Sequence, residues 1–166
     1  AKASELGRPV RWHLDRENGV ATLEDPGSRL QGYRVPLRPM LGGVGLASGF
    51  ASPPLSTGDT GRAGGNMDFP EVVAGSTVLL PVQQPGALLY LGDAHALQGD
   101  GETSQYALET SMDVEFSVEI IKGTAIMMPR VETSDAIMTL GQAGSLDEAT
   151  RAATTGLIQW LQQDYG

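Results

Sequence analysis

Residues 92–102 gather most of the side chains in this chain that could do chemistry. The stretch reads GDAHALQGDGE and holds five functional side chains: Asp93, His95, Gln98, Asp100 and Glu102. Small, flexible residues separate them, which lets the backbone and a ligand come close together. A second stretch upstream, GGNMDFP at residues 64–70, adds Asn66 and Asp68. These two stretches form the candidate site.

The spacing predicts that the polar side chains project in pairs. Along an extended chain, residues two apart point to the same face. Three pairs have this spacing: Asp93 with His95, Asn66 with Asp68, and Asp100 with Glu102. An imidazole with carboxylate oxygens, and no sulfur, suits zinc or another first-row divalent ion, or calcium where oxygens dominate. The acidic residues do not have the spacing of an EF-hand loop.

A polar turn is the alternative interpretation of the same residues. Gly-Asp and Asp-Gly pairs are common in turns, because Asp bonds local amides and Gly accepts positive φ; this interpretation suits Asp100-Gly101. It suits His95 less well, because that residue stands between an apolar strand and the acidic loop. Residue types alone support a metal site and an acidic turn equally. We interpret His13, a lone histidine beside Asp15, as structural.

The composition indicates a single β-rich unit over residues 1–166. The 22 glycines, 10 prolines and 5% aromatic residues are typical of short strands joined by many turns. The formal net charge of -9 argues against nucleic acid as a partner. No apolar run reaches the roughly 18 to 20 residues that cross a bilayer, and the first residues lack the apolar core of a signal peptide. The absence of cysteine excludes disulfides and thiolate metal sites.

The elements that must position the site follow from hydrophobic alternation. We predict an α+β fold: antiparallel, barrel-like strands with one C-terminal helix packed on the sheet. The clearest strand is 112–120, where apolar and polar residues alternate, so one face should be buried. Other strands are expected in these places: a hairpin within 10–25, an edge or barrel-corner strand within 33–47, and strands at 76–82, 87–92, 125–128 and 136–140.

The remaining segments are a loop and a helix. The sequence of residues 48–65 predicts a long loop that is either functional or mobile. The GGVG run before it is no phosphate loop, because no helix follows it. Ser145 and Glu148 fit a capping box, and apolar residues recur at helical spacing over 145–163. Glu109 either reaches the pocket of the polar cluster or caps the sheet edge as a solvated acid.

Residues 64–102 also carry a long composite motif. It runs from GGN-x-D through an AGS strand start and an LPV…PGA strand pair to GD-x-H-x-x-QGDGE. This run resembles the acetamidase/formamidase family of amide hydrolases, and VPLRPMLGGVGLA and ALETSMDVEFSVEIIKG resemble family segments too. The resemblance extends from about Val10 to the C-terminus. It covers only the C-terminal half of a family member, because members carry an additional β-rich N-terminal portion.

The resemblance implies hydrolysis of the C–N bond of a small linear amide, such as formamide or acetamide, to ammonia and a carboxylate. It implies a divalent metal, with zinc expected and calcium as the alternative, and a water that this metal makes nucleophilic. The implied roles are metal ligands His95, Asp93 and Asp68; catalytic carboxylates Glu102, as general base, and Asp100; and substrate-orienting amides Asn66 and Gln98.

A chain that resembles half of a family member also implies an alternative. It would be an incomplete or non-catalytic subunit that binds a metal or small ligand and needs an N-terminal half. The expected partners are a small amide and either further copies of this chain or that N-terminal half, with no nucleic acid and no membrane. The localisation is either cytoplasmic or exported; segments such as ALETSMDVEF resemble exported members, which points towards the periplasm.

Overall fold

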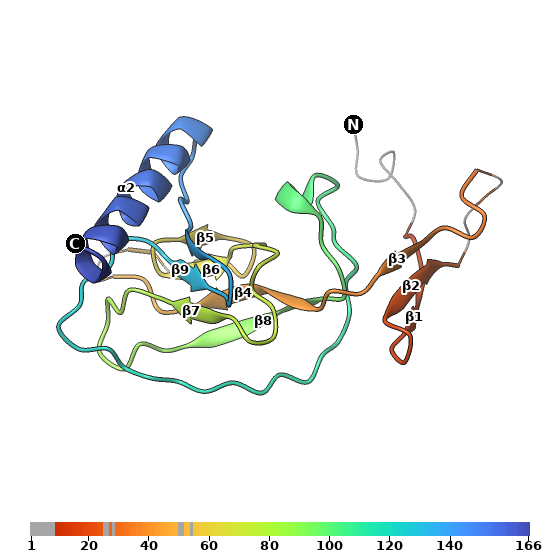
Figure 1. The fold of residues 1–166 in the computed structure, drawn as a ribbon, viewed down its shortest axis with the longest axis horizontal. Helices are drawn as coiled ribbons and strands as arrows, with labels where there is room; N and C mark the ends of the chain where they lie inside the picture. The colour runs from red at the N-terminus through yellow and green to blue at the C-terminus, as the bar shows by residue number, and fades with distance from the viewer. Residues whose placement is uncertain (1–8, 25–26, 28, 50–51, 54) are drawn as a thin grey trace. The chain divides into compact units, whose positions relative to one another are not determined.

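The computed structural model describes residues 9–24, 27, 29–49, 52–53 and 55–166. The chain divides into two compact units, Ala1–Arg38 and Pro39–Gly166 (Figure 1). Whether the two act as a single domain stays a prediction. Among the described residues, no helix has the length and apolar character needed to pass through a bilayer.

The first unit is a three-stranded antiparallel sheet in the order β1-β2-β3. The strands are Trp12–Asp15, Val20–Leu23 and Arg34–Pro36. The predicted hairpin is confirmed: β1 pairs with β2 across a turn in which Gly19 has a φ of 65°. Asp15 accepts hydrogen bonds from the side chain and the backbone nitrogen of Asn18, at 2.7 and 3.0 Å. These bonds lower the pKa of the Asp15 carboxyl.

The second unit contains two antiparallel sheets, in the orders β5-β6-β4-β8 and β10-β9-β7. The strands are β4 (Met40–Gly45), β5 (Thr60–Gly61), β6 (Gly64–Asn66), β7 (Thr77–Leu79), β8 (Tyr90–His95), β9 (Arg130–Glu132) and β10 (Ile137–Thr139). The β-rich, antiparallel fold is therefore confirmed. Both sheets are open, so the described residues form no closed barrel.

The core of the second unit lies between its two sheets. Four buried residues form its centre: Val44, Val72, Val131 and Leu140. Val44 comes from β4 and Val131 from β9, so the cluster joins one sheet to the other. Apolar side chains that leave water in this way stabilise the unit by roughly 25 cal/mol for each Å² buried. The core therefore fixes β4, the strand on which the candidate site rests.

The C-terminal helix α2 spans Leu146–Asp164, which confirms the predicted helix. The hydroxyl of Ser145 accepts a hydrogen bond from the backbone nitrogen of Glu148 at 3.3 Å, as a helix N-cap does. The buried face of the helix contains Gly156 and Trp160. Thr139 of β10 donates its hydroxyl to the carbonyl oxygen of Ala153 in the helix at 2.7 Å, so the helix packs on the second sheet.

Two predicted strands are wrong. Residues 112–120 join no strand among the described residues, and all of their apolar side chains except Met112 are exposed. Alternation shows that a strand has an apolar face, but burial requires a second surface that covers that face. The strand predicted at 125–128 begins instead at Arg130, as β9.

Other boundaries are shifted. The segment 33–47 divides into β3 and β4, and β4 lies between β6 and β8 rather than at an edge. Pro36 ends β3, which is the edge strand of its own sheet, as the missing N–H of proline requires. The loop predicted at 48–65 is shortened by β5 and β6; its residues 50, 51 and 54 lie outside the described residues. The strands predicted at 76–82, 87–92 and 136–140 are confirmed as β7, β8 and β10.

Candidate functional site

The candidate site begins on β8, which runs past its predicted end and includes His95. Asp93 and His95 both lie on the strand and their side chains meet as predicted, although Asp93 has a φ of 58° and is not in the extended conformation on which the prediction rested. Oδ1 of Asp93 lies 3.2 Å from Nε2 of His95. The imidazole is only 1% exposed, whereas Asp93 is open to solvent. His95 thus forms the buried floor of the site, and Asp93 forms part of its rim.

Gln98 decides which nitrogen of His95 faces the acidic side chains. Its amide nitrogen donates to the carbonyl oxygen of Asp68 at 2.5 Å, so its Oε1 points the other way, 2.9 Å from Nδ1 of His95. A carbonyl oxygen cannot donate, so Nδ1 must carry a proton and donate it to Gln98. In the neutral ring, the lone pair is then on Nε2. Gln98, which the family resemblance assigns to the substrate, is buried and uses both ends of its amide inside the protein.

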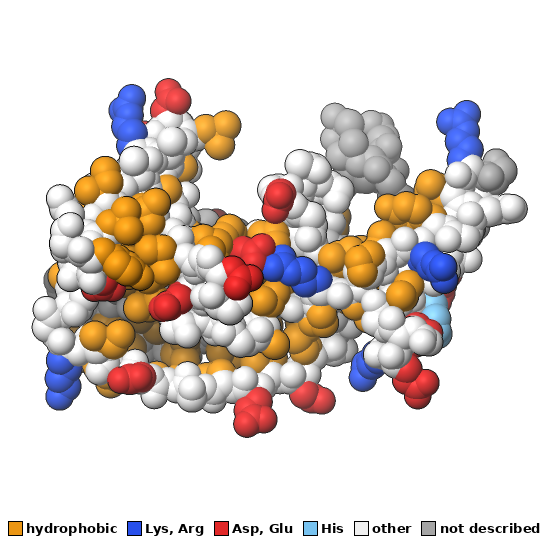
Figure 2. Space-filling model, in the orientation of Figure 1, with side chains coloured by type: hydrophobic (Ala, Val, Ile, Leu, Met, Phe, Trp, Pro, Cys, Tyr) orange, Lys and Arg blue, Asp and Glu red, His pale blue; other side chains and the backbone are white. Residues whose placement is uncertain are grey.

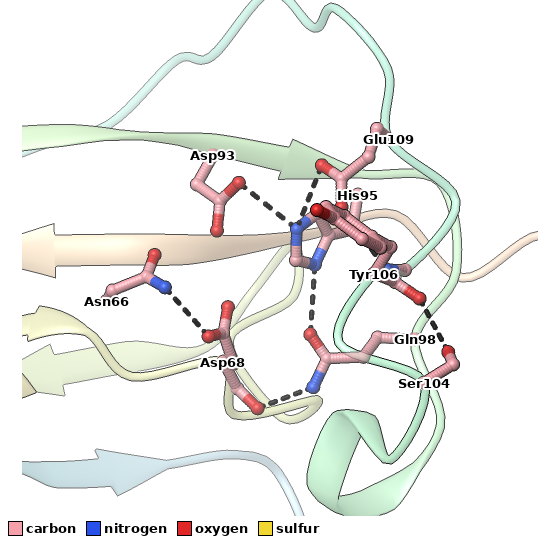
Figure 3. Close-up of polar contacts among 9 residues, drawn as sticks. Asn66, Asp68, Asp93, His95, Gln98, Ser104, Tyr106 and Glu109 are labelled. Carbon is pink, nitrogen blue, oxygen red and sulfur yellow. Dashed lines mark hydrogen bonds and ion pairs between the residues drawn. The ribbon is translucent and has the colours of Figure 1, made fainter. Parts of the chain in front are cut away.

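Glu109 also reaches Nε2 of His95, with its Oε2 at 3.3 Å. Figure 3 shows the carboxylates of Asp93 and Glu109 both directed at this nitrogen. The backbone of Glu109 pairs with that of His95 as an isolated antiparallel bridge, which holds the residue beside β8. Of the two possibilities left by the sequence for Glu109, the structure shows the one at the cluster. His95, Glu102 and Glu109 offer ligand atoms that lie within 4.8 Å of one another.

Asp68 forms a second such group with Asp93 and His95. The side-chain nitrogen of Asn66 donates to its Oδ2 at 2.9 Å, whereas its Oδ1 is buried and has no hydrogen-bond partner among the described residues. A buried carboxylate oxygen without a donor is costly. Burial, followed by the negative charges of Glu102 and Asp93, raises the pKa of Asp68 to about 6.

Gly42 on β4 provides the space in which two of these carboxylates meet. A methyl group on its α-carbon would overlap Oδ2 of Asp93 and lie 2.5 Å from Oδ1 of Asp68. Its carbonyl oxygen accepts from the backbone nitrogens of Met67 at 2.9 Å and Asp68 at 3.1 Å. The sequence interpretation missed Gly42 because it tested the GGVG run only as a phosphate loop. The available signal was a glycine inside a strand, which marks a close approach.

Backbone strain is concentrated at the same place. Asp68, Asp93 and Glu102 have φ angles of 44°, 58° and 43°. These three are half of the described non-glycine residues with positive φ, so the strain follows the acidic cluster rather than turns in general. Such a conformation costs of order 1–3 kcal/mol per residue and persists where the surrounding structure enforces it, as at active sites and ligand clamps.

The segment Asp100–Glu102 forms a single 3-10 turn with Gly101 at a φ of 73°. The turn interpretation of Asp100-Gly101 is therefore confirmed, and Glu102 nevertheless reaches the cluster. Asp100 is exposed and belongs to neither group of possible ligands among the described residues. It lines a small neighbouring pocket formed by residues 97–108, which Glu102 also borders. The structure thus brings Glu102 into the candidate site and leaves Asp100 beside it.

The donor set fits a divalent cation. The lone pair of His95 and the carboxylate oxygens around it are all acceptors, and the buried Oδ1 of Asp68 has no donor. Acceptors that converge without protons or a cation between them repel one another. A cation held by the imidazole and the carboxylates would relieve that repulsion and satisfy the orphaned oxygen. The residues at the site can therefore hold a metal ion.

Comparison with known proteins places this geometry in a family. The profile of the Acetamidase/Formamidase family matches residues 37–155. The chain is 37% identical over 125 residues to an acetamidase of Mycolicibacterium smegmatis. That alignment covers 69% of this chain and 29% of the relative.

Solved structures agree with the profile. The crystal structure of an acetamidase from Yersinia enterocolitica matches with a TM-score of 0.76 and 33% identity, over 93% of this chain and 44% of that chain. The acetamidase of Bacillus halodurans matches with a TM-score of 0.79 and 34% identity, over 92% and 48% of the two chains. This chain thus spans less than half the length of these relatives. Because the profile match includes the whole cluster from Gly42 to Glu109, we conclude that the chain belongs to the acetamidase/formamidase family.

Proposed function

We propose that this chain carries the hydrolytic centre of an amide hydrolase. The substrates would be small linear amides such as formamide and acetamide, and the products ammonia and a carboxylate. One observation carries the proposal: the carboxylates of Asp93 and Glu109 both face Nε2 of His95, and Asp68, whose buried Oδ1 has no hydrogen-bond partner among the described residues, offers a ligand atom within 4.8 Å of those of Asp93 and His95. Family membership supports the reaction class. The activity of the whole protein is part of the proposal, since the chain spans only part of its relatives.

Asp68, Asp93 and His95 would hold the divalent cation. Zinc suits an imidazole with carboxylates and no thiolate, and calcium is the alternative because oxygens outnumber nitrogen. Such an ion supplies Lewis acidity, which polarises the amide carbonyl and makes water a better nucleophile. Gln98 holds Nδ1–H and so directs Nε2 of His95 at the site, and Asn66 orients the carboxylate of Asp68. Both amides then act as positioning residues.

Glu102 would move the proton. It is half-buried, and its carboxylate lies within 4.8 Å of ligand atoms on His95 and Glu109. It would take a proton from water as the water oxygen adds to the amide carbon, and then pass that proton to the leaving nitrogen as the C–N bond breaks. One amide and one water thus yield one carboxylate and one ammonium ion. Asp100, beside the neighbouring pocket, would exchange protons between Glu102 and solvent.

The test combines metal content with ammonia release. The purified chain, loaded with zinc, should bind one equivalent and release ammonia from formamide or acetamide. Asp68→Asn should lose the metal, because the orphaned carboxylate oxygen is removed. Glu102→Gln should retain the metal and lose about 10²- to 10⁴-fold in kcat. Asp113→Asn, an exposed acid outside the site, is the matched control and should change neither value.

A second candidate function is a metal-binding subunit without activity of its own. The observation that favours it is the length of the chain, which covers 44% and 48% of the two solved acetamidases. One equivalent of metal with no ammonia release from any small amide would support this second function and contradict the first. Absence of metal binding, with Asp68→Asn indistinguishable from the parent chain, would contradict both.

A further inference from the structure

Residues 111–121 form an extended segment that belongs to no sheet. Pairing with β8 stops just before it: Thr110 donates its backbone nitrogen to the carbonyl oxygen of Ala94 at 2.9 Å, and the bridge between His95 and Glu109 precedes that bond. Beyond Ser111, no described residue exchanges a backbone hydrogen bond with the segment. In Figure 1 it is the bare teal trace that follows β8 without becoming a strand. Its backbone donors and acceptors are thus free to pair.

The segment has the residue pattern of a strand that is half buried. Its apolar side chains alternate with polar ones, yet the side chains of Phe116, Val118 and Ile120 are 56%, 67% and 73% exposed. Figure 2 shows hydrophobic and acidic side chains along the lower edge of the unit, which this segment follows in Figure 1. A flat, apolar, unpaired strand is a template for pairing with another strand. The pattern and the exposure together predict a covering surface.

A second copy of this chain fits that surface poorly in the three registers at the centre of the segment. In an antiparallel pair of two identical segments centred on Phe116, Asp113 would lie opposite Glu119. Centring the pair on Ser117 would place Glu115 opposite Glu119, and centring it on Glu115 would place that acid opposite itself. Like charges directly opposite one another are destabilising. The complementary strand should instead have neutral or basic residues on this face and apolar residues on the other.

The relatives indicate where such a strand comes from. Each matched acetamidase has more than half of its length outside the region that corresponds to this chain. We propose that residues 111–121 are the docking strand for that remaining part of a family-length protein, which pairs with them by adding a β-strand. The added strand covers Phe116, Val118 and Ile120 and places neutral or basic side chains opposite the acids. This inference does not depend on the chemistry of the metal cluster.

The test uses hydrogen exchange with a defined probe. The probe is the part of the Bacillus halodurans acetamidase that lies outside its match to this chain, produced as a separate polypeptide. The chain alone should be monomeric in light scattering, and its amides at 112–121 should exchange at the rates of an unstructured peptide. Added probe should form a 1:1 complex and slow exchange of those amides by about 100-fold or more.

Substitutions test whether the added polypeptide contacts residues 111–121. Val118→Asn with Ile120→Asn should weaken the complex by about tenfold or more, because two apolar contacts are lost. Ile158→Asn, which changes an exposed residue of α2, is the matched control and should alter the affinity less than about twofold. Circular dichroism confirms that each variant keeps the fold.

Four results would overturn the proposal. Slow exchange of 112–121 in the isolated monomer would show that the chain covers the segment itself. Protection in a homodimer would assign the segment to a second copy. Unchanged exchange with the probe, or equal weakening by the Ile158 control, would show that the added polypeptide does not dock there. None of these experiments measures metal binding or amide hydrolysis, so a failure of this proposal can be told apart from a failure of the proposed function.

Discussion

The side-chain oxygen of Gln98 lies 2.9 Å from Nδ1 of His95 and accepts the proton of that ring nitrogen. In the neutral ring the contact leaves the lone pair on the opposite nitrogen, Nε2, which faces the carboxylates of Asp93 and Glu109. The orientation of the Gln98 amide is fixed in turn by its bond to a backbone carbonyl, which can only accept. A residue that does not face the acidic groups therefore determines the chemistry of one that does.

Gln98→Leu should release this constraint while it preserves the size of the buried side chain. The ring of His95 should then populate both neutral tautomers, and metal affinity should fall by about 10- to 100-fold, the usual effect of losing a partner behind a metal ligand. Nitrogen NMR of the imidazole distinguishes the tautomers in the metal-free protein. An unchanged tautomer in the variant would show that Gln98 does not control the ring.

Gly42→Ala should damage the site and spare the fold. The new methyl group would overlap the carboxylate of Asp93 and crowd that of Asp68, and these are the ends of side chains, which can shift without moving the backbone. We expect zinc affinity to fall by about 10- to 100-fold and the free energy of unfolding to change by less than about 1 kcal/mol.

Gly92→Ala is the control for this change. Gly92 lies on β8, and a methyl group there would meet no atom within 4 Å. Calorimetric titration with zinc and urea unfolding should show no effect for this control. Equal losses of zinc affinity in the two variants would contradict the role given to Gly42.

Asp68→Asn should stabilise the metal-free protein in a manner that depends on pH. The pKa of Asp68 rises from 3.8 to about 6 on folding. Folding therefore favours its protonated form, and the stability linked to that form is complete below pH 3.8 and lost as the pH rises through about 6. Asparagine resembles the protonated acid, can still accept from Asn66, and keeps that stability at every pH.

Urea unfolding with a chelator measures this effect. The variant should match the parent near about pH 4 and exceed it by about 1 kcal/mol near about pH 8, a modest value because the carboxylate is partly open to solvent. A difference in unfolding free energy that does not change with pH would contradict the assignment of this titration to Asp68.

Gly141→Ala should destabilise the second unit. A methyl group at Gly141 would overlap the backbone carbonyl oxygen of Ala149 in α2, and a helix backbone cannot move aside as a side chain can. We expect a loss of about 2 kcal/mol, typical of overpacking. Gly144→Ala, where a methyl group meets nothing within 4 Å, is the control in the same urea experiment. A Gly141 variant as stable as this control would show that the contact is not tight.

Local rules sufficed for several parts of this protein. The turn at Gly19 and the cap at Ser145 depend on residues within a few positions of one another. The sequence alone therefore predicted them, as well as the antiparallel fold and, through its long motif, the family. The localisation and the oligomeric state stay predictions.

Only the tertiary structure assembled the site. The space at Gly42, the partner of Gln98 and the approach of Glu109 all join segments that are distant along the chain or separated by a turn. The pairing of β4 with β6 and β8, and the bridge that joins Glu109 to His95, set those distances, and no local pattern encodes them. The same reason explains the exposed segment 111–121: alternation determined which of its faces is apolar, whereas burial of that face depends on a surface that the described residues do not provide.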